Sequence, residues 1–182
     1  MKHYPVFLDL RSRRVLLIGA PGKIPDLRAA GAKVRLRRGF RVADLRGVDL
    51  VICDNAKVSR RVFSAASARH IFCNVVDVPP LCSFIAPAIV RKGHLQIAIS
   101  TGGRSPALAV RVKEEIARTL GDEYAELLDL LTPLRRRVFT RFPNDPAARS
   151  KVFQAMVRGP ALDLLRDGRR AAAKQRLIAY LK

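Results

Sequence analysis

The stretch Ile71-Phe-Cys-Asn-Val-Val-Asp-Val-Pro-Pro-Leu-Cys-Ser-Phe-Ile-Ala-Pro87 decides the fold class. Its first part, Ile71 to Val76, is rich in β-branched and aromatic residues, as a buried strand is. Asp77 follows, and Pro79 and Pro80 prevent the strand from continuing in the middle of a sheet. We therefore expect Asp77 at the carboxyl end of a strand, facing the crevice where open α/β sheets bind ligands. The alternative is that Asp77 only forms the turn, since Asp favours turn positions.

Three earlier segments have the composition of buried strands: Arg14–Gly19, Lys33–Phe40 and Val48–Asn55. A helix is predicted over Lys57–Arg69, because its apolar residues fall on one helical face. Strands that alternate with short helices favour a parallel sheet with right-handed crossovers. The predicted fold class is α/β, with a truncated Rossmann-like parallel sheet.

Two glycines follow the first predicted strand, as they do where a dinucleotide-binding unit opens. They are Gly19 and Gly22, and the full G-x-G-x-x-G pattern is missing. Pro21 removes an amide that could have bound phosphate, and Pro25 leaves little room for a helix before Gly31. A residual cofactor turn and a plain strand-to-helix turn without ligand both fit this pattern.

The next two predicted strands end in polar residues. Arg37 and Arg38 stand where an NAD site would place an acidic residue for the ribose hydroxyls. They could meet a 2′-phosphate, a substrate carboxylate or only solvent. Asp54 and Asn55 end the following strand and are candidates for the cofactor edge of the sheet.

The pattern changes after Pro87, where a hairpin is predicted with its turn at Lys92-Gly93. Ser105 is a good N-cap and Pro106 a good first residue for the helix that follows. The segment leading into this helix could hold an anion through its amides and the helix dipole, and it comprises Thr101, Gly102, Gly103, Arg104 and Ser105. A capped helix without ligand is the alternative.

The rest of the chain is predicted to be helical, with breaks at Pro143–Pro146 and Arg158–Pro160. We expect three parts: a Rossmann-like domain over residues 1–86, a small dimerisation segment over 87–120 and a helical domain over 121–182.

Composition limits the classes of function. The chain has 182 residues, 49% of them hydrophobic, and a formal net charge of +20. Such charge attracts polyanions: nucleic acid, anionic membrane or anionic small molecules. Aromatics make up only 6% and no nucleic-acid-binding motif is present, so specific recognition of nucleic acid is not expected. Charge-driven, strongly salt-dependent binding of nucleic acid and a basic surface without a dedicated partner remain open.

The cysteines, the histidines and the N-terminal segment give no sign of a disulfide, a metal site or a membrane segment. Cys53, Cys73 and Cys82 lack CxxC spacing and lie in or beside apolar segments, which predicts buried free thiols. The three histidines are dispersed, so no metal site is expected. No apolar run is long enough to cross a bilayer and the start lacks a signal-peptide core, so we expect a cytoplasmic protein without membrane contact.

The order of these motifs resembles that of one known family, the precorrin-2 dehydrogenases and sirohydrochlorin ferrochelatases. Members of this family also form the N-terminal module of siroheme synthases. The resemblance covers nearly the whole chain, and only the helical tail matches loosely. The matching segments are Tyr4–Leu10 with Arg14–Gly19, Phe40 with Asp44–Leu45, Cys53–Asn55, Phe72–Asp77, Phe84–Ile89 and Ile97–Ala109.

The resemblance implies a homodimer that binds NAD, oxidises precorrin-2 to sirohydrochlorin and, in many members, inserts Fe²⁺ as a substrate to give siroheme. It places one shared catalytic aspartate on Asp77. Asn74 and Ser83 would then lie near Asp77, and Thr101–Ser105 would hold a carboxylate arm of the tetrapyrrole. A degenerate paralogue that binds a tetrapyrrole or a protein partner without turnover is the alternative.

The chain departs from the family in the NAD-binding half. The family has a full helix, a second strand, another helix and a third strand before the position of Phe40. In this chain the single segment Lys33–Phe40 takes the place of two strands of the family. On the order of 25 residues are therefore missing relative to the family, which is about one strand–helix unit. We therefore expect NAD binding to be weakened or lost, and chelation to be the safer prediction because it needs no dinucleotide.

Overall fold

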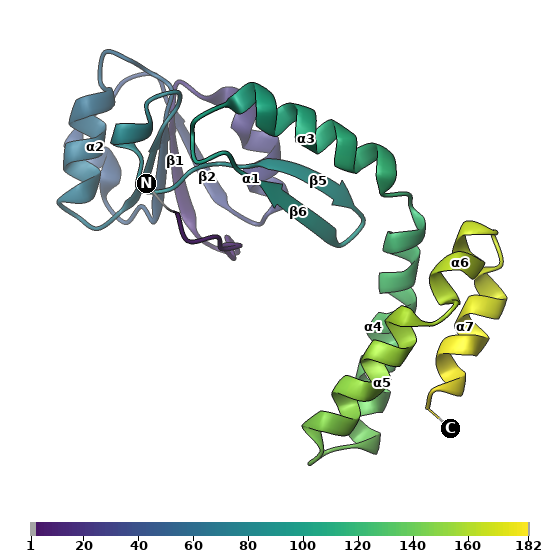
Figure 1. The fold of residues 1–182 in the computed structure, drawn as a ribbon. Helices are drawn as coiled ribbons and strands as arrows, with labels where there is room; N and C mark the ends of the chain where they lie inside the picture. Colours follow the sequence, from purple (N-terminus) through teal and green to yellow (C-terminus); the bar gives the residue numbers. More distant parts are fainter. Residues whose placement is uncertain (1–2, 182) are drawn as a thin grey trace. The chain divides into compact units, whose positions relative to one another are not determined.

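The computed structural model describes residues 3–181, which form two compact units (Figure 1). The first unit holds the chain up to Pro87 together with Ser100–Pro106. The second unit holds Ala88–Ile99 and the chain from Ala107 onward. The predicted three-part division stays a prediction.

The first unit contains a parallel sheet in the order β2-β1-β3-β4. Its strands are β1 (Arg14–Ile18), β2 (Lys33–Arg37), β3 (Leu50–Cys53) and β4 (Phe72–Val75). The predicted Rossmann-like α/β class is confirmed. Only the lengths differ, and β2 is the clearest case: it stops at Arg37 because Phe40 turns into the core, where it is buried beside Leu45.

Both faces of the sheet are covered, as a parallel sheet requires. Alternate side chains of β1 and β3 pack against α2 (Ser59–Ser67), and the others pack on the side of the short helix α1 (Ile24–Ala29). Figure 1 shows α2 and α1 on opposite sides of the strands. Single-turn 3₁₀ segments lie at Pro21–Lys23, Val42–Leu45 and Pro79–Leu81.

Strand β2 lies at the edge of the sheet. A full Rossmann sheet has the order 3-2-1-4-5-6, so the observed order is its inner part without the strand outside β2. Basic side chains alternate along β2, at Lys33, Arg35 and Arg37. Charges of this kind protect an exposed edge from pairing with another chain.

The second unit begins with the predicted hairpin, β5 (Ala88–Lys92) and β6 (Leu95–Ile99). Its turn is anchored on α4 (Glu123–Arg141), because Lys92 Nζ lies 2.8 Å from a carboxylate oxygen of Asp122. Gly93 has a positive φ of 55°, and a Cβ there would lie 3.0 Å from Cβ of Ala125. Helix α3 (Pro106–Thr119) starts at the predicted proline.

The remaining helices are α5 (Pro146–Arg158), α6 (Ala161–Arg166) and α7 (Arg170–Ala179). They share one apolar core with α4, centred on buried Val138, Met156 and Leu177. Asp145 caps α5 by accepting a hydrogen bond of 2.8 Å from the Ala148 amide. Within residues 3–181, none of the helices combines the length and apolarity needed to span a bilayer.

The three cysteines are free thiols, as predicted. Cys53 and Cys73 are fully buried, whereas Cys82, which was also predicted to be buried, is only partly buried. Burial raises the pKa of Cys73 to about 12, and it also raises the pKa values of Cys53 and Cys82. Thiols in this state are not nucleophiles at neutral pH. In the part of the chain that the structure describes, no three His, Cys, Asp or Glu residues are grouped to hold a metal ion.

Candidate functional site

The carboxyl ends of the parallel strands bring four of the predicted site residues, Gly19, Asp54, Asn55 and Asp77, to one edge of the sheet. Hydrogen bonds between neighbouring strands continue past the strand ends. The Asp54 amide donates to the Ile18 carbonyl at 2.7 Å, and the Val76 amide donates to the Cys53 carbonyl at 2.9 Å. Gly19, Asp54 and Asp77 therefore follow three neighbouring strands at the same edge. This is the edge at which open α/β sheets bind ligands.

Asp77 is exposed at this edge and has a left-handed backbone, with φ of 58°. Asp tolerates this conformation better than most residues with a Cβ, but the conformation still costs free energy. Such strain in a non-glycine residue is frequent at functional sites. The turn is closed by the Val78 amide, which donates to the Val75 carbonyl at 3.2 Å, and by the 3₁₀ turn that begins at Pro79.

The side chains of Asn74 and Ser83 hold the following loop on β4. Asn74 Nδ2 donates to the Phe84 carbonyl at 3.0 Å. Ser83 Oγ accepts from the Cys73 amide at 2.7 Å, and the Ser83 amide donates to the Cys73 carbonyl at 2.7 Å. These contacts give both residues a structural function, and a direct contact with substrate stays a prediction.

Sequence reasoning missed Cys82 as a residue that fixes the loop beyond Asp77. Its Sγ accepts from the Val75 amide at 3.3 Å and lies 3.2 Å from the Val75 carbonyl oxygen. The thiol thus links the end of β4 to the segment after the prolines. A lone cysteine beside an apolar segment gives no signal for this function in the sequence.

The predicted anion cradle, Thr101–Ser105, is a compact turn. Thr101 Oγ1 accepts from the Ser105 amide at 3.1 Å, and the amides of Gly102 and Arg104 donate to Ser100 Oγ and to the Thr101 carbonyl. Three amides of the predicted cradle are therefore used inside the turn. Within the described structure, the Gly103 amide and the Arg104 side chain are among the groups that this turn can still offer to an anion.

Gly103 brings this turn against the loop after Asp77. A Cβ on Gly103 would lie 3.2 Å from Cγ of Pro79 and 3.8 Å from Cδ1 of Ile85, and its φ is 79°. Two segments that are separate in the sequence, one after β4 and one before α3, therefore meet in the first unit. This contact explains a glycine at position 103 by packing as well as by backbone conformation.

The predicted cofactor turn is only partly assembled. Gly19 has φ of 74°, and a Cβ there would lie 2.4 Å from the Asp54 carbonyl oxygen, so Gly19 lies directly against Asp54 and Asn55. Asn55 Nδ2 donates to the Arg38 carbonyl at 3.1 Å. Gly22 lies in open space without a positive φ, and no close neighbour requires a glycine there.

These residues fit a dinucleotide poorly. The space left by the missing Cβ of Gly19 faces the Asp54 carbonyl rather than a groove for pyrophosphate. Pro21 has no amide hydrogen, and α1 has six residues. Strand β2 ends at Arg37, whose Nε lies 3.6 Å from a carboxylate oxygen of Asp44, and no acidic side chain stands at the usual ribose position.

Comparison with known proteins relates the chain to proteins of siroheme synthesis. Residues 6–88 match the family described as "Putative NAD(P)-binding", and residues 92–119 match "Sirohaem biosynthesis protein central". The siroheme synthase of Thioalkalivibrio sulfidiphilus is 33% identical over all of this chain and 42% of its own length. Siroheme synthase 1 of Pectobacterium atrosepticum is 36% identical over 82% of this chain and 37% of its own length.

The chain thus spans less than half of the length of these curated relatives. The match with the Thioalkalivibrio protein extends over 209 aligned positions although this chain has 182 residues, in agreement with a segment missing here.

Among solved structures, the precorrin-2 dehydrogenase SirC matches 98% of this chain and 98% of its own, with a TM-score of 0.67 and 20% identity, which supports the fold. By sequence and by fold, the chain belongs to the family of precorrin-2 dehydrogenases and ferrochelatases that forms the N-terminal module of siroheme synthases.

Proposed function

We propose that this protein is an enzyme of siroheme biosynthesis and that Asp77 is its proton acceptor. The observation that carries the proposal is the placement of Asp77: an exposed carboxylate on a strained backbone at the carboxyl edge of a parallel sheet. The turn that contains Gly103 packs against Pro79 of the same loop, and Arg104 follows Gly103 in that turn. A carboxylate near a cationic group suits a substrate that carries both acidic N–H groups and carboxylate arms.

The reaction we assign first is insertion of Fe²⁺ into sirohydrochlorin. Two pyrrole N–H protons must leave the macrocycle as the metal enters, and an exposed carboxylate can accept a proton at each step and pass it to water. The macrocycle carries eight carboxylates, so a chain with a net charge of +20 attracts it from solution. Chelation needs no dinucleotide, which agrees with the poor fit of the residues around Gly19.

Metal insertion into sirohydrochlorin tests the proposal. Under anaerobic conditions, the rate with Fe²⁺ or Co²⁺ should exceed the uncatalysed rate. Asp77→Asn should lower this excess at least a hundredfold, as removal of a general base commonly does. Asp26→Asn, which removes the same charge from the exposed face of α1, should leave the rate unchanged. An unaltered rate in Asp77→Asn would exclude Asp77 as the proton acceptor.

We also propose that NAD binding is weakened or lost. The short α1, Pro21 and the arginines that end β2 support this part, and the match to an NAD(P)-binding family over residues 6–88 opposes it. Isothermal titration with NAD⁺ and with NADP⁺ distinguishes the two. Micromolar affinity for either would contradict the proposal and restore precorrin-2 oxidation as the expected activity.

Binding without catalysis is the second candidate, and the shortened dinucleotide region favours it. A degenerate paralogue would bind sirohydrochlorin tightly without accelerating metal insertion. The same assay separates the candidates, because tight binding with an uncatalysed rate supports the carrier, whereas acceleration that depends on Asp77 supports the enzyme.

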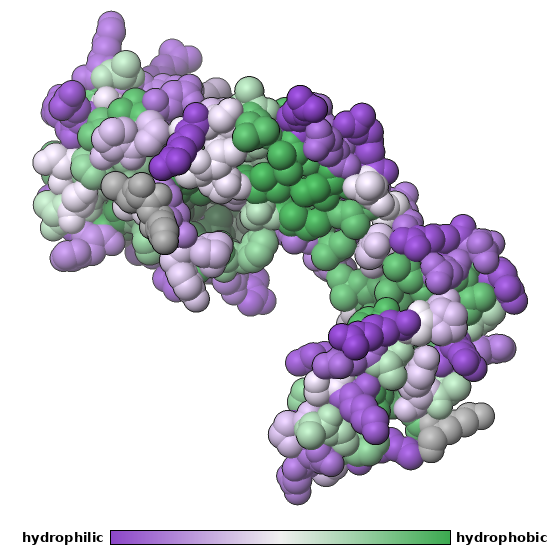
Figure 2. All heavy atoms as spheres, in the orientation of Figure 1, coloured by the Kyte–Doolittle hydropathy of each residue, from purple (hydrophilic) through white to green (hydrophobic). Residues whose placement is uncertain are grey.

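We further propose a homodimer formed through residues 87–120, which include the segment matched by the central siroheme family. Figure 2 shows apolar side chains gathered around α3 and the β5–β6 hairpin. Val110 on α3 is 48% exposed, and Leu95, Ile97 and Ile99 are only partly buried. An apolar area of this kind on a highly charged protein is typical of a contact surface.

A further inference from the structure

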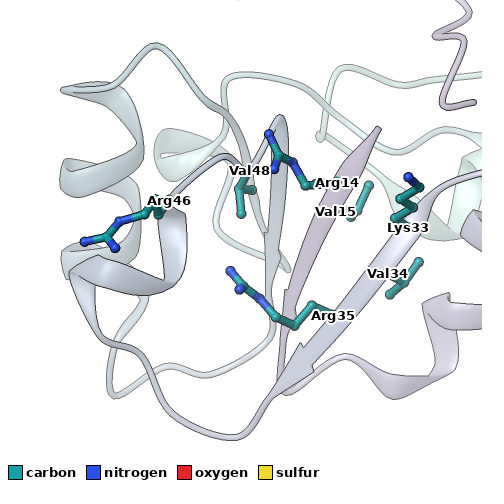
Figure 3. Close-up of a pocket in the computed structure, with 7 residues that line it drawn as sticks. All are labelled: Arg14, Val15, Lys33, Val34, Arg35, Arg46 and Val48. Atoms are coloured by element: carbon teal, nitrogen blue, oxygen red, sulfur yellow. The ribbon is translucent and has the colours of Figure 1, made fainter. Parts of the chain in front are cut away.

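A cationic cavity lies at the edge of the sheet opposite to Asp77. It has a volume of about 330 Å³ and occupies the space around the first residues of β1 and β2 and the turn before β3 (Figure 3). Seven residues line it: Arg14, Val15, Lys33, Val34, Arg35, Arg46 and Val48. Because parallel strands place their amino ends together, this cavity is separate from the edge that holds Asp77 and Gly19.

Four of the seven lining residues are cations and none is acidic. Arg35 donates to the carbonyl oxygen of Asp44. In residues 3–181, the side chains of Arg14, Lys33 and Arg46 form no hydrogen bond or salt bridge. The nearby Asp49 carboxylate accepts instead from the Arg14 amide at 2.8 Å and lies 3.3 Å from the Arg13 guanidinium.

Protection of an edge strand accounts for only part of this cluster. Lys33 and Arg35 belong to the edge strand β2, but Arg14 begins the inner strand β1 and Arg46 precedes β3. Arg14 and Lys33 are also direct partners in the strand register. Like charges on neighbouring strands repel each other, so the fold alone gains nothing from this pair.

The backbone of the neighbouring turn leaves room for the Arg14 guanidinium. Gly47 has φ of 67°, and a Cβ there would lie 2.7 Å from Cζ of Arg14. The guanidinium therefore rests on the bare backbone of Gly47 at the wall of the cavity. Val48 is buried in the core that packs against α2 and gives the cavity an apolar wall.

We propose that this cavity binds a compact phosphate-bearing anion of the di- or triphosphate class. Guanidinium groups bind phosphate oxygens in pairs, and several converging cations suit an anion with several charges in a short chain. A cavity of about 330 Å³ is at the lower end of the range for small-molecule sites and too small for a tetrapyrrole with eight carboxylate arms. The anion is either a free polyphosphate or the phosphate chain of a nucleotide.

Isothermal titration with sodium tripolyphosphate at about 0.15 M KCl tests the proposal. Wild-type protein should bind one anion per chain with saturation. Arg14→Gln/Lys33→Gln should weaken binding at least tenfold, and the single variant Arg46→Gln should weaken it at least threefold. Circular dichroism checks that each variant is folded. Absence of saturable binding to wild-type protein would overturn the proposal.

The matched control is Arg60→Gln/Arg61→Gln, which removes the same charge from the exposed face of α2. Its affinity should stay within twofold of wild type, and an equal loss there would mean that only net charge attracts the anion. Citrate binding as tightly as tripolyphosphate would also overturn the phosphate assignment. ATP binding at least tenfold more tightly than tripolyphosphate would assign the anion to a nucleotide, and equal affinity to a free polyphosphate. Asp77→Asn should bind tripolyphosphate as tightly as wild type. The test of this cavity is therefore independent of the proposed enzymatic function.

Discussion

Asp77 combines two properties that a single residue rarely has: a carboxylate at the ligand edge of the sheet and a backbone in the left-handed region. The backbone angle is a cost, because the Cβ of an L-residue crowds its own carbonyl there. A glycine would remove that cost. The presence of Asp instead of Gly at this turn supports the chemical function proposed for the side chain.

Substitutions at Asp77 separate conformation from chemistry. Asp77→Gly should raise the free energy of unfolding relative to Asp77→Ala by about 1 kcal/mol, because only alanine carries the strained Cβ. Both variants should lose metal insertion. Urea denaturation monitored by circular dichroism measures the first effect. Equal stability of the two variants would mean that position 77 is not left-handed in solution.

Asp49 makes the stability of the first unit depend on pH. The Arg14 amide, with a smaller effect of Arg13, lowers the pKa of Asp49 below its ordinary value. The stabilisation by Asp49 is therefore complete above the unfolded pKa of about 4 and is lost as the pH falls through the lowered folded value.

The variant Asp49→Asn should cost at most about 1 kcal/mol at pH 7, since the side chain is partly exposed to solvent. It should also flatten the fall of unfolding free energy as the pH drops below about 4. Denaturation at a series of pH values measures this slope, with Asp26→Asn as the control. A slope as steep as that of wild type would contradict this origin of the acid sensitivity.

The turn between β1 and α1 shows how two glycines in one element can differ. Gly19 is required by a positive φ and by contact with Asp54, whereas Gly22 has ordinary dihedrals and open surroundings. Gly19→Ala should destabilise the protein by more than about 2 kcal/mol, because strain and steric overlap add. Gly22→Ala should be neutral or stabilising by up to about 1 kcal/mol. Thermal unfolding of the two variants measures the difference, and similar effects would refute it.

At the scale of the whole molecule, the proposed homodimer gives a testable association. Val110→Glu places a charge in the exposed apolar area of α3 and should raise the dimer dissociation constant at least tenfold. Val157→Glu on α5 is a matched control, since Val157 is 49% exposed and lies outside residues 87–120. Sedimentation velocity over a range of concentrations measures both. A wild-type protein that is monomeric at about 100 μM would contradict the proposed dimer, since stable homodimers dissociate only at far lower concentrations.

Local signals were sufficient for the elements of the fold. The β-branched runs after Arg14 and before Asp77, the prolines at 79 and 106 and the glycine turn at 93 all act within a few residues, so the strands, the helix start and the hairpin followed from the sequence. The missing unit beside β2 was inferred by comparing the spacing of the motifs with that of the family the chain resembles. The position at which β2 ends could not be predicted from the sequence, because Phe40 leaves the sheet to join a core built from distant residues.

The sequence by itself determined that a parallel sheet presents Asp77 at its carboxyl edge, because a strand that ends in an acid and two prolines has few other solutions. Only the tertiary structure decided which side chains meet. It assigned Asn74 and Ser83 to holding a loop, placed Gly103 on Pro79, and gathered Arg14, Lys33 and Arg46 around one cavity. The physical reason is that these contacts join residues far apart in the chain, and their geometry depends on strand register and packing that no local pattern specifies.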